Sequence, residues 1–187
     1  MTMSMATFFF IHELAEQCMF VRMAKIDLKN CRTTDTCGLD REYYYLQSLL
    51  IALGNISKIL WPIKKKYENR GIELRSTLNI KEDSALKNRD LRNLFEHFDE
   101  RADDWFAVED RHRFSDRGVG SMEGVIIPSE KDRLRTFNPE TWTLICLGQE
   151  YKLGPAIQAA YELYEMIQEK TGQPGKKVQP LPGEFDE

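Results

Sequence analysis

The strongest constraint on the fold is a long stripe of apolar side chains in the first half of the chain. Asp40 can cap the start of the helix that carries this stripe, and Pro62, which has no backbone N–H, should end it. A helix with so long an apolar side must be covered, so we expect it at the centre of a helical bundle. The stripe follows helical spacing at Leu46, Leu49, Leu50, Leu53, Ile56, Leu60 and Ile63.

Other segments with helical periodicity supply partners for the central helix. The last of them is opened by Pro155 and closed by Gly172, residues typical of the two ends of a helix. A longer one starts at Asp83 or Ser84, either of which can act as its N-cap. The predicted helices are residues 6–30, 72–78, 84–108 and 155–172.

Near the C-terminus the hydrophobic period changes from helix to strand. Thr141–Leu147 is rich in β-branched and aromatic residues, Gly148-Gln149 is a turn signal, and Glu150–Leu153 can return. This pattern predicts a β-hairpin at about 141–153. We therefore expect a mainly α protein, a bundle of four to five helices with one small β-hairpin near the C-terminus. A single domain should cover residues 1–170, followed by a flexible tail at 171–187.

The composition argues against several classes of protein. The chain has 187 residues, 26 basic and 30 acidic side chains and a net charge of −4, which disfavours a broad, sequence-independent nucleic-acid surface. Its 4 cysteines and 3 histidines show no zinc spacing, so we expect no metal and no cofactor. The cysteines predict reduced thiols, with a disulfide framework as the less favoured alternative. No apolar run approaches a membrane span, and we expect a cytoplasmic protein.

One glycine-rich segment invites comparison with nucleotide-binding loops. In Gly118–Gly124 the third glycine is out of register for the G-x-G-x-x-G pattern. Neither a strand before this segment nor a helix after it is predicted. We therefore expect a mobile loop here and no phosphate site.

The one arrangement that suggests chemistry lies inside the predicted helix 84–108. Arg92 is followed directly by Asn93 and, after four intervening residues, by His97. With 13 arginines and 3 histidines in the chain, about 0.6 matches to such a pattern are expected by chance. The spacing alone therefore decides nothing, and its context has to be considered.

In that context the run Arg92–Arg101 resembles the HEPN superfamily (higher eukaryotes and prokaryotes nucleotide-binding domains). Members carry an arginine, a polar residue and a histidine four to six residues after the arginine, on a late helix of a bundle. Arg92, Asn93 and His97 match these three places. The runs Ile59–Trp105 and Asn138–Thr141 also look like a bacterial branch of that superfamily.

The resemblance implies a homodimer whose two motifs meet in a cleft. In many members that cleft cleaves RNA without a metal, whereas others only bind, or serve as antitoxin or scaffold partners. A nearly all-apolar segment at Phe8–Phe10 is compatible with such association, and burial in the protein's own core is the alternative. RNA or a nucleotide is the expected ligand, and no membrane partner is expected.

The residues allow this chemistry on their own terms. The His97 imidazole can move a proton to or from a ribose 2′-hydroxyl, Arg92 can stabilise the phosphate, and Asn93 can orient either group. The first hypothesis is thus a metal-independent endoribonuclease with these three catalytic residues. The alternative is a non-catalytic nucleotide-, nucleic-acid- or protein-binding module, with Arg92 and His97 in a structural network with Glu96 and Glu100.

Geometry and charge make the first hypothesis conditional. On one straight helix Arg92 and His97 lie about 140° apart, whereas Asn93 and His97 are only one turn from each other. A kink, a long arginine reach or a second subunit must bring the arginine and the histidine together. Residues 81–110 also hold ten acidic and five basic side chains, which should repel an RNA backbone.

Overall fold

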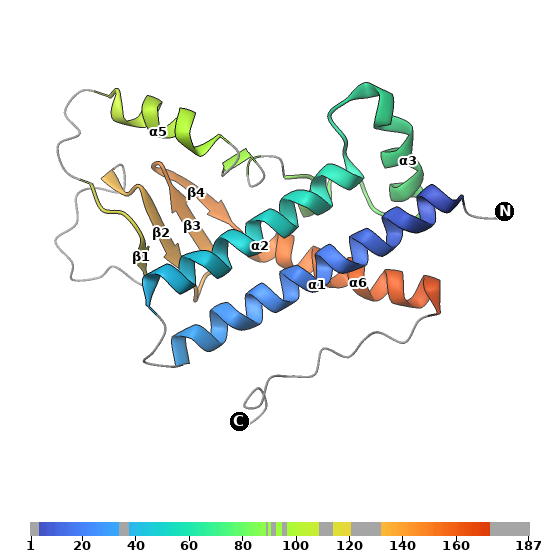
Figure 1. Cartoon of the computed structure of the whole chain (residues 1–187), viewed down its shortest axis with the longest axis horizontal. Helices are drawn as coiled ribbons and strands as arrows, with labels where there is room; N and C mark the ends of the chain where they lie inside the picture. Colours follow the sequence, from blue (N-terminus) through green and yellow to red (C-terminus); the bar gives the residue numbers. More distant parts are fainter. Residues whose placement is uncertain are drawn as a thin grey trace.

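The computed structural model describes residues 4–33, 38–88, 90, 93–94, 97–108, 114–120 and 132–172. Across these ranges the chain is mainly helical with one small sheet, as predicted (Figure 1). The α-helices are α1 (Met5–Thr33), α2 (Leu39–Leu60), α3 (Glu68–Thr77), α5 (Phe98–Phe106) and α6 (Gly154–Thr171), with 3-10 helices η1 (Lys65–Tyr67) and η2 (Ala85–Lys87). The strands are β1 (Gly118–Val119), β2 (Arg135–Asn138), β3 (Thr143–Cys146) and β4 (Gln149–Lys152). The predicted tail lies outside these ranges from residue 173 onward.

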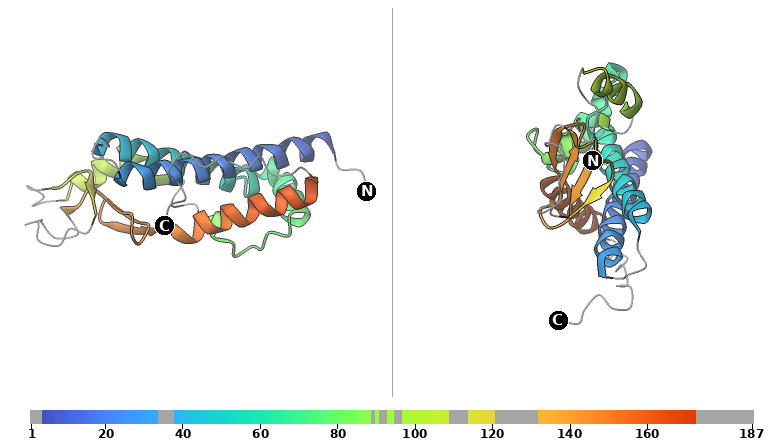
Figure 2. Two further views of the ribbon diagram at one scale, coloured as in Figure 1. Left: turned by 90° about the horizontal axis from the view of Figure 1, so that it is seen from below. Right: turned by 90° about the vertical axis from the view of Figure 1, so that its left-hand side faces the viewer.

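The bundle is built on α1 and α2, which lie side by side, with α6 packed beneath them (Figures 1 and 2). The predicted stripe on α2 is buried from Leu46 to Leu60, whereas Ile63, beyond the end of the helix, is exposed. Leu14 on α1 and Leu163 on α6 belong to the same core. Each buried leucine or isoleucine contributes about 1.5–3 kcal/mol, so this stripe is a major source of stability.

The end of α2 is determined by a close contact with α3. Pro62 cannot continue the helix, and the chain turns so tightly that only glycine fits at position 71. A Cβ on Gly71 would lie 2.6 Å from the Leu60 carbonyl oxygen and 2.7 Å from Cδ of Pro62. Arg75 of α3 donates a hydrogen bond to the same carbonyl and pairs with Glu82 at 2.7 Å. These contacts hold the turn after α2 in place.

The sheet is larger than the predicted hairpin, with its strands in the order β1-β2-β3-β4. The hairpin itself is confirmed as β3 and β4, joined by Leu147 and Gly148, whose φ angles of 53° and 74° suit a type I′ turn. β2 adds an antiparallel strand and β1 a parallel one. The prediction of a loop from residue 118 is therefore wrong at Gly118–Val119, which pair with a strand distant in sequence. Residues 121–131 of that predicted loop lie outside the described ranges.

The two faces of the sheet have different surroundings. Side chains alternate along each strand, and the register decides which of them share a face. The inner face, toward α2, carries the buried row Phe137, Leu144 and Tyr151. The outer face carries two cross-strand rows, Thr136–Ile145–Glu150 and Asn138–Thr143–Lys152.

The helix predicted at 84–108 is not continuous, which corrects the sequence expectation. After η2, Asn88 leaves the helical region with φ −58° and ψ 106°. α5 starts only at Phe98, after His97 with φ −124° and ψ 33°. Across this break Leu94 is buried in the bundle core, and Phe98, at the start of α5, packs against the same core and against Arg135 of β2.

Two expectations from composition can be compared with the structure. Cys18 and Cys146 are free buried thiols, but Cys31 is disulfide-bonded, so the prediction of reduced thiols is wrong at Cys31. No single helix in the described part of the chain is long and apolar enough to cross a membrane. The pair formed by α2 and Lys65–Thr77 meets that criterion only jointly, with a bend of 79° between them.

Candidate functional site

The predicted motif lies at the break before α5. Arg92 is outside the described residues, so its position relative to His97 stays a prediction. Asn93 is half-buried, and its carbonyl accepts a hydrogen bond from the His97 amide at 3.3 Å. The His97 side chain is 53% exposed, and its Nδ1 lies 3.4 Å from a carboxylate oxygen of Glu100. The structure therefore brings Asn93 and His97 within one turn and pairs the histidine with an acid.

The surface next to His97 is acidic. α5 carries four carboxylates and one arginine. That arginine, Arg101, is directed to the sheet, where its Nη1 donates to the Tyr151 hydroxyl at 3.4 Å. The charged group that contacts His97 in the described part of the chain is thus a carboxylate. The exposed acids of α5 are Asp99, Glu100, Asp103 and Asp104.

α5 is anchored to the inner face of the sheet through Arg135. Its guanidinium donates to both carboxylate oxygens of Asp116, at 2.7 and 2.6 Å, and lies 4.9 Å from the ring centroid of Phe98. The hydrogen bonds that Arg135 donates to Asp116 raise the pKa of Arg135. Nearby, burial raises the pKa of the Tyr43 hydroxyl, which donates to the Gly118 carbonyl at 3.1 Å. These groups satisfy one another, so they act as structural support for the sheet and α5.

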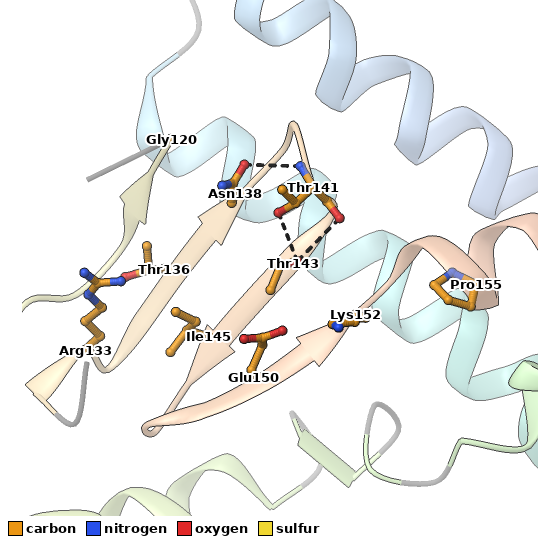
Figure 3. Close-up of a pocket in the computed structure, with 10 residues that line it drawn as sticks. All are labelled: Gly120, Arg133, Thr136, Asn138, Thr141, Thr143, Ile145, Glu150, Lys152 and Pro155. Carbon is orange, nitrogen blue, oxygen red and sulfur yellow. Dashed lines mark hydrogen bonds between the residues drawn. The ribbon is translucent and has the colours of Figure 1, made fainter. Parts of the chain in front are cut away.

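A larger open site lies on the outer face of the sheet (Figure 3). Its volume is about 650 Å³, within the range of small-molecule sites in proteins. The two outer-face rows form its floor, and Ile145 and Pro155 are the apolar side chains among its lining residues. Its other lining residues are Gly120, Arg133, Thr141 and Pro155.

Two polar groups of this outer-face pocket are buried without a partner. Arg133 Nε and Thr136 Oγ1 make no hydrogen bond, and Thr136 is only 4% exposed. An unsatisfied buried group costs about 1–3 kcal/mol, and such groups are uncommon in folded proteins. The neighbouring Thr143 differs, because its Oγ1 lies 3.0 Å from Oγ1 of Thr141. The unpaired groups therefore gather at the Arg133 end of the pocket, where Figure 3 shows the two side chains next to each other.

Sequence reasoning did not find the outer-face pocket. The alternation of Thr141 and Thr143 with the apolar Trp142 and Leu144 in the predicted hairpin is a signal for an outward polar face. The residues that matter most, Arg133 and Thr136, precede that hairpin. Their place in the site depends on the pairing of β2 with β3, which no local pattern reveals.

In the described residues, no group of three or more His, Cys, Asp and Glu side chains could hold a metal ion.

Comparison of the chain with models of known protein families, with curated proteins and with solved structures finds no match. The function must therefore be inferred from the geometry and the charges of the chain itself.

Proposed function

We propose that this chain is a non-catalytic HEPN-like helical module that binds a partner, in the first place a protein, through the surface around His97, and that it does not cleave RNA. The observation that carries the proposal is the charge next to His97. Its Nδ1 lies 3.4 Å from the Glu100 carboxylate. Metal-independent RNA cleavage needs a histidine to move a proton and a cation to stabilise charge on the phosphate. A carboxylate beside the imidazole repels the phosphate and so opposes the stabilisation of its charge.

The acidic surface of α5 supports the same proposal. Two like charges about 4 Å apart repel by about 1 kcal/mol in water and by about 4 kcal/mol at a protein surface. Each exposed carboxylate of α5 therefore opposes the approach of an RNA backbone to His97. The same carboxylates favour a partner with a basic surface through charge complementarity. We infer that Arg92 and His97 belong to a polar network at a binding surface.

RNA cleavage in EDTA tests this proposal. The wild type, His97→Ala and Arg92→Ala are incubated with labelled single-stranded and hairpin RNAs, and none of them should cut above the buffer control. Cleavage by the wild type that both variants lose would refute the proposal and establish the ribonuclease. Equal cleavage by all three proteins would show a contaminant or a different catalytic site.

A metal-independent endoribonuclease assembled as a homodimer is the second candidate. It is favoured by the 53% exposure of the His97 side chain, because an RNA substrate has access to the imidazole. Exposed apolar side chains on α1 and α2 also suit association with a second copy, which would have to bring Arg92 to His97. These side chains include Phe9, Phe20, Met23, Tyr44 and Ile51.

Light scattering coupled to size exclusion tests the dimer directly. The second candidate expects a dimer for the wild type and a monomer for Phe20→Glu, because a carboxylate at the centre of an apolar interface is costly to bury. Arg22→Gln, at an exposed position on the same helix, changes the net charge by the same one unit and is the control for the charge. A wild type that is monomeric at all concentrations removes the dimeric ribonuclease from consideration.

A further inference from the structure

We propose that the outer-face pocket binds a small phosphate monoester of the sugar-phosphate class, with the phosphate held by Arg133 and Thr136. This site lies on the face of the sheet opposite to α5. The inference therefore goes beyond the function proposed for the His97 surface and does not depend on it.

The phosphate end of the pocket is defined by donors that lack acceptors. Arg133 is placed next to β2 by its bridge to Ser115, and its buried Nε has no partner. Thr136, on the first outer-face row, has an unpaired buried hydroxyl. Asn138 uses its Oδ1 to accept backbone amides at 3.0 and 3.3 Å, which leaves its Nδ2 as a donor. A guanidinium fork, a hydroxyl and an amide together match the several oxygens of a phosphate better than the two of a carboxylate.

The charge of the pocket agrees with an anionic ligand. Arg133 and Lys152 are its two cations and Glu150 is its one acid, so the lining has a net positive charge. The whole chain has a net charge of −4, which makes this local excess of positive charge distinctive. None of the three side chains has an ion-pair partner in the described part of the molecule. The charges are therefore available to a ligand.

The rest of the pocket suits a hydroxylated body. Thr136 and Glu150 are separated by Ile145 across three adjacent strands, so they lie about 10 Å apart, two strand spacings. This distance keeps the Glu150 carboxylate away from the bound phosphate and matches the length of a pentose or hexose phosphate. Glu150 can accept hydrogen bonds from sugar hydroxyls, Lys152 can donate to them, and Ile145 offers aliphatic surface to the ring.

Isothermal titration calorimetry of the full chain with D-ribose 5-phosphate tests the proposal. D-ribose, inorganic phosphate and AMP are titrated separately into the millimolar range. Ribose 5-phosphate should bind, and ribose should not, because the proposed site depends on the phosphate. Binding of AMP with similar affinity would show that the sugar phosphate can be part of a nucleotide, whereas exclusion of AMP would restrict the site to free sugar phosphates.

Three variants locate the binding. Arg133→Gln and Thr136→Val should each weaken ribose 5-phosphate by about 10- to 100-fold, the size expected when a hydrogen bond to a charged group is lost. Thr136→Val keeps the shape of the side chain, so it remains informative if Arg133→Gln folds poorly. Lys65→Gln on η1 removes one positive charge at the other end of the molecule and should bind like the wild type (Figure 1).

Several results would overturn the proposal. The first is no detectable binding of ribose 5-phosphate by the folded wild type. The second is equal binding of ribose and ribose 5-phosphate. The third is equal weakening in Lys65→Gln and Arg133→Gln, which would show a general electrostatic effect and no site on the sheet.

Discussion

Replacing Thr136 by valine should stabilise the protein in the absence of ligand, although most substitutions of buried residues destabilise. Thr136 is 4% exposed and its Oγ1 has no hydrogen-bond partner. Removing an unsatisfied buried hydroxyl recovers about 1–3 kcal/mol, and the methyl group that replaces it fills the same space and adds apolar burial. Valine also suits a strand. Allowing for imperfect fit, we expect the free energy of unfolding to rise by about 1–2 kcal/mol.

Urea denaturation followed by circular dichroism measures this change at neutral pH. The midpoint should move to higher urea with an unchanged slope, and the melting temperature should rise by about 2–4 °C for each kcal/mol in a chain of this size. Thr143→Val is the matched control, because its hydroxyl lies 3.0 Å from Oγ1 of Thr141. That control should lose about 0.5–1.5 kcal/mol. If Thr136→Val destabilises as much as Thr143→Val, the Thr136 hydroxyl has a partner and the reasoning is refuted.

Three further predictions concern the bundle, a buried thiol and the independence of the two surfaces. Gly71→Ala should destabilise the folded protein by about 1–3 kcal/mol, because the added Cβ would lie 2.6 Å from the Leu60 carbonyl oxygen. Thermal unfolding measures this loss, and Gly38→Ala is the control because nothing lies within 4 Å of its added Cβ. Burial raises the pKa of Cys146 from 9.0 to about 12, so Ellman's reagent at pH 8 should label this thiol only on unfolding, and rapid labelling of the native protein would contradict its burial. The contribution of Cys146 to the free energy of unfolding should be intact below pH 9.0 and be lost as the pH rises to about 12. His97→Ala should leave ribose 5-phosphate binding unchanged in calorimetry, because His97 precedes a helix on the opposite face of the sheet; a tenfold loss would show that the two surfaces are coupled.

The helices could be predicted because their signals are local. The stripe on α2, the stop at Pro62 and the glycine that ends α6 each depend on residues within one or two turns. The left-handed conformation of Gly172, with φ 61°, is the C-cap expected from its position. The hairpin of β3 and β4 was predictable for the same reason, since a glycine turn separates two short β-rich segments.

The parts that were mispredicted depend on contacts between distant segments. β1 has only two residues, and its strand character comes from pairing with β2 across a long separation. The predicted helix 84–108 failed because periodicity sees one apolar stripe through Leu94 and Phe98 but not the backbone between them. In the structure both side chains reach the bundle core, although the chain leaves the helical region at Asn88 and again at His97. Periodicity identifies the apolar residues but cannot locate the backbone breaks between them.

The two candidate sites differ in how far the sequence could predict them, and the physical reason is the same. The His97 motif was visible in the sequence because it occupies six consecutive positions, yet consecutive positions on a helix need not converge on one ligand. The outer-face pocket was invisible because its floor takes two residues from each of three strands. Strand pairing brings such residues together at a fixed spacing, so that their unpaired donors face the same pocket. In this molecule the convergence of polar side chains from distant positions thus arises from the sheet, while the consecutive residues of the helical motif remain a prediction that the sequence alone suggested.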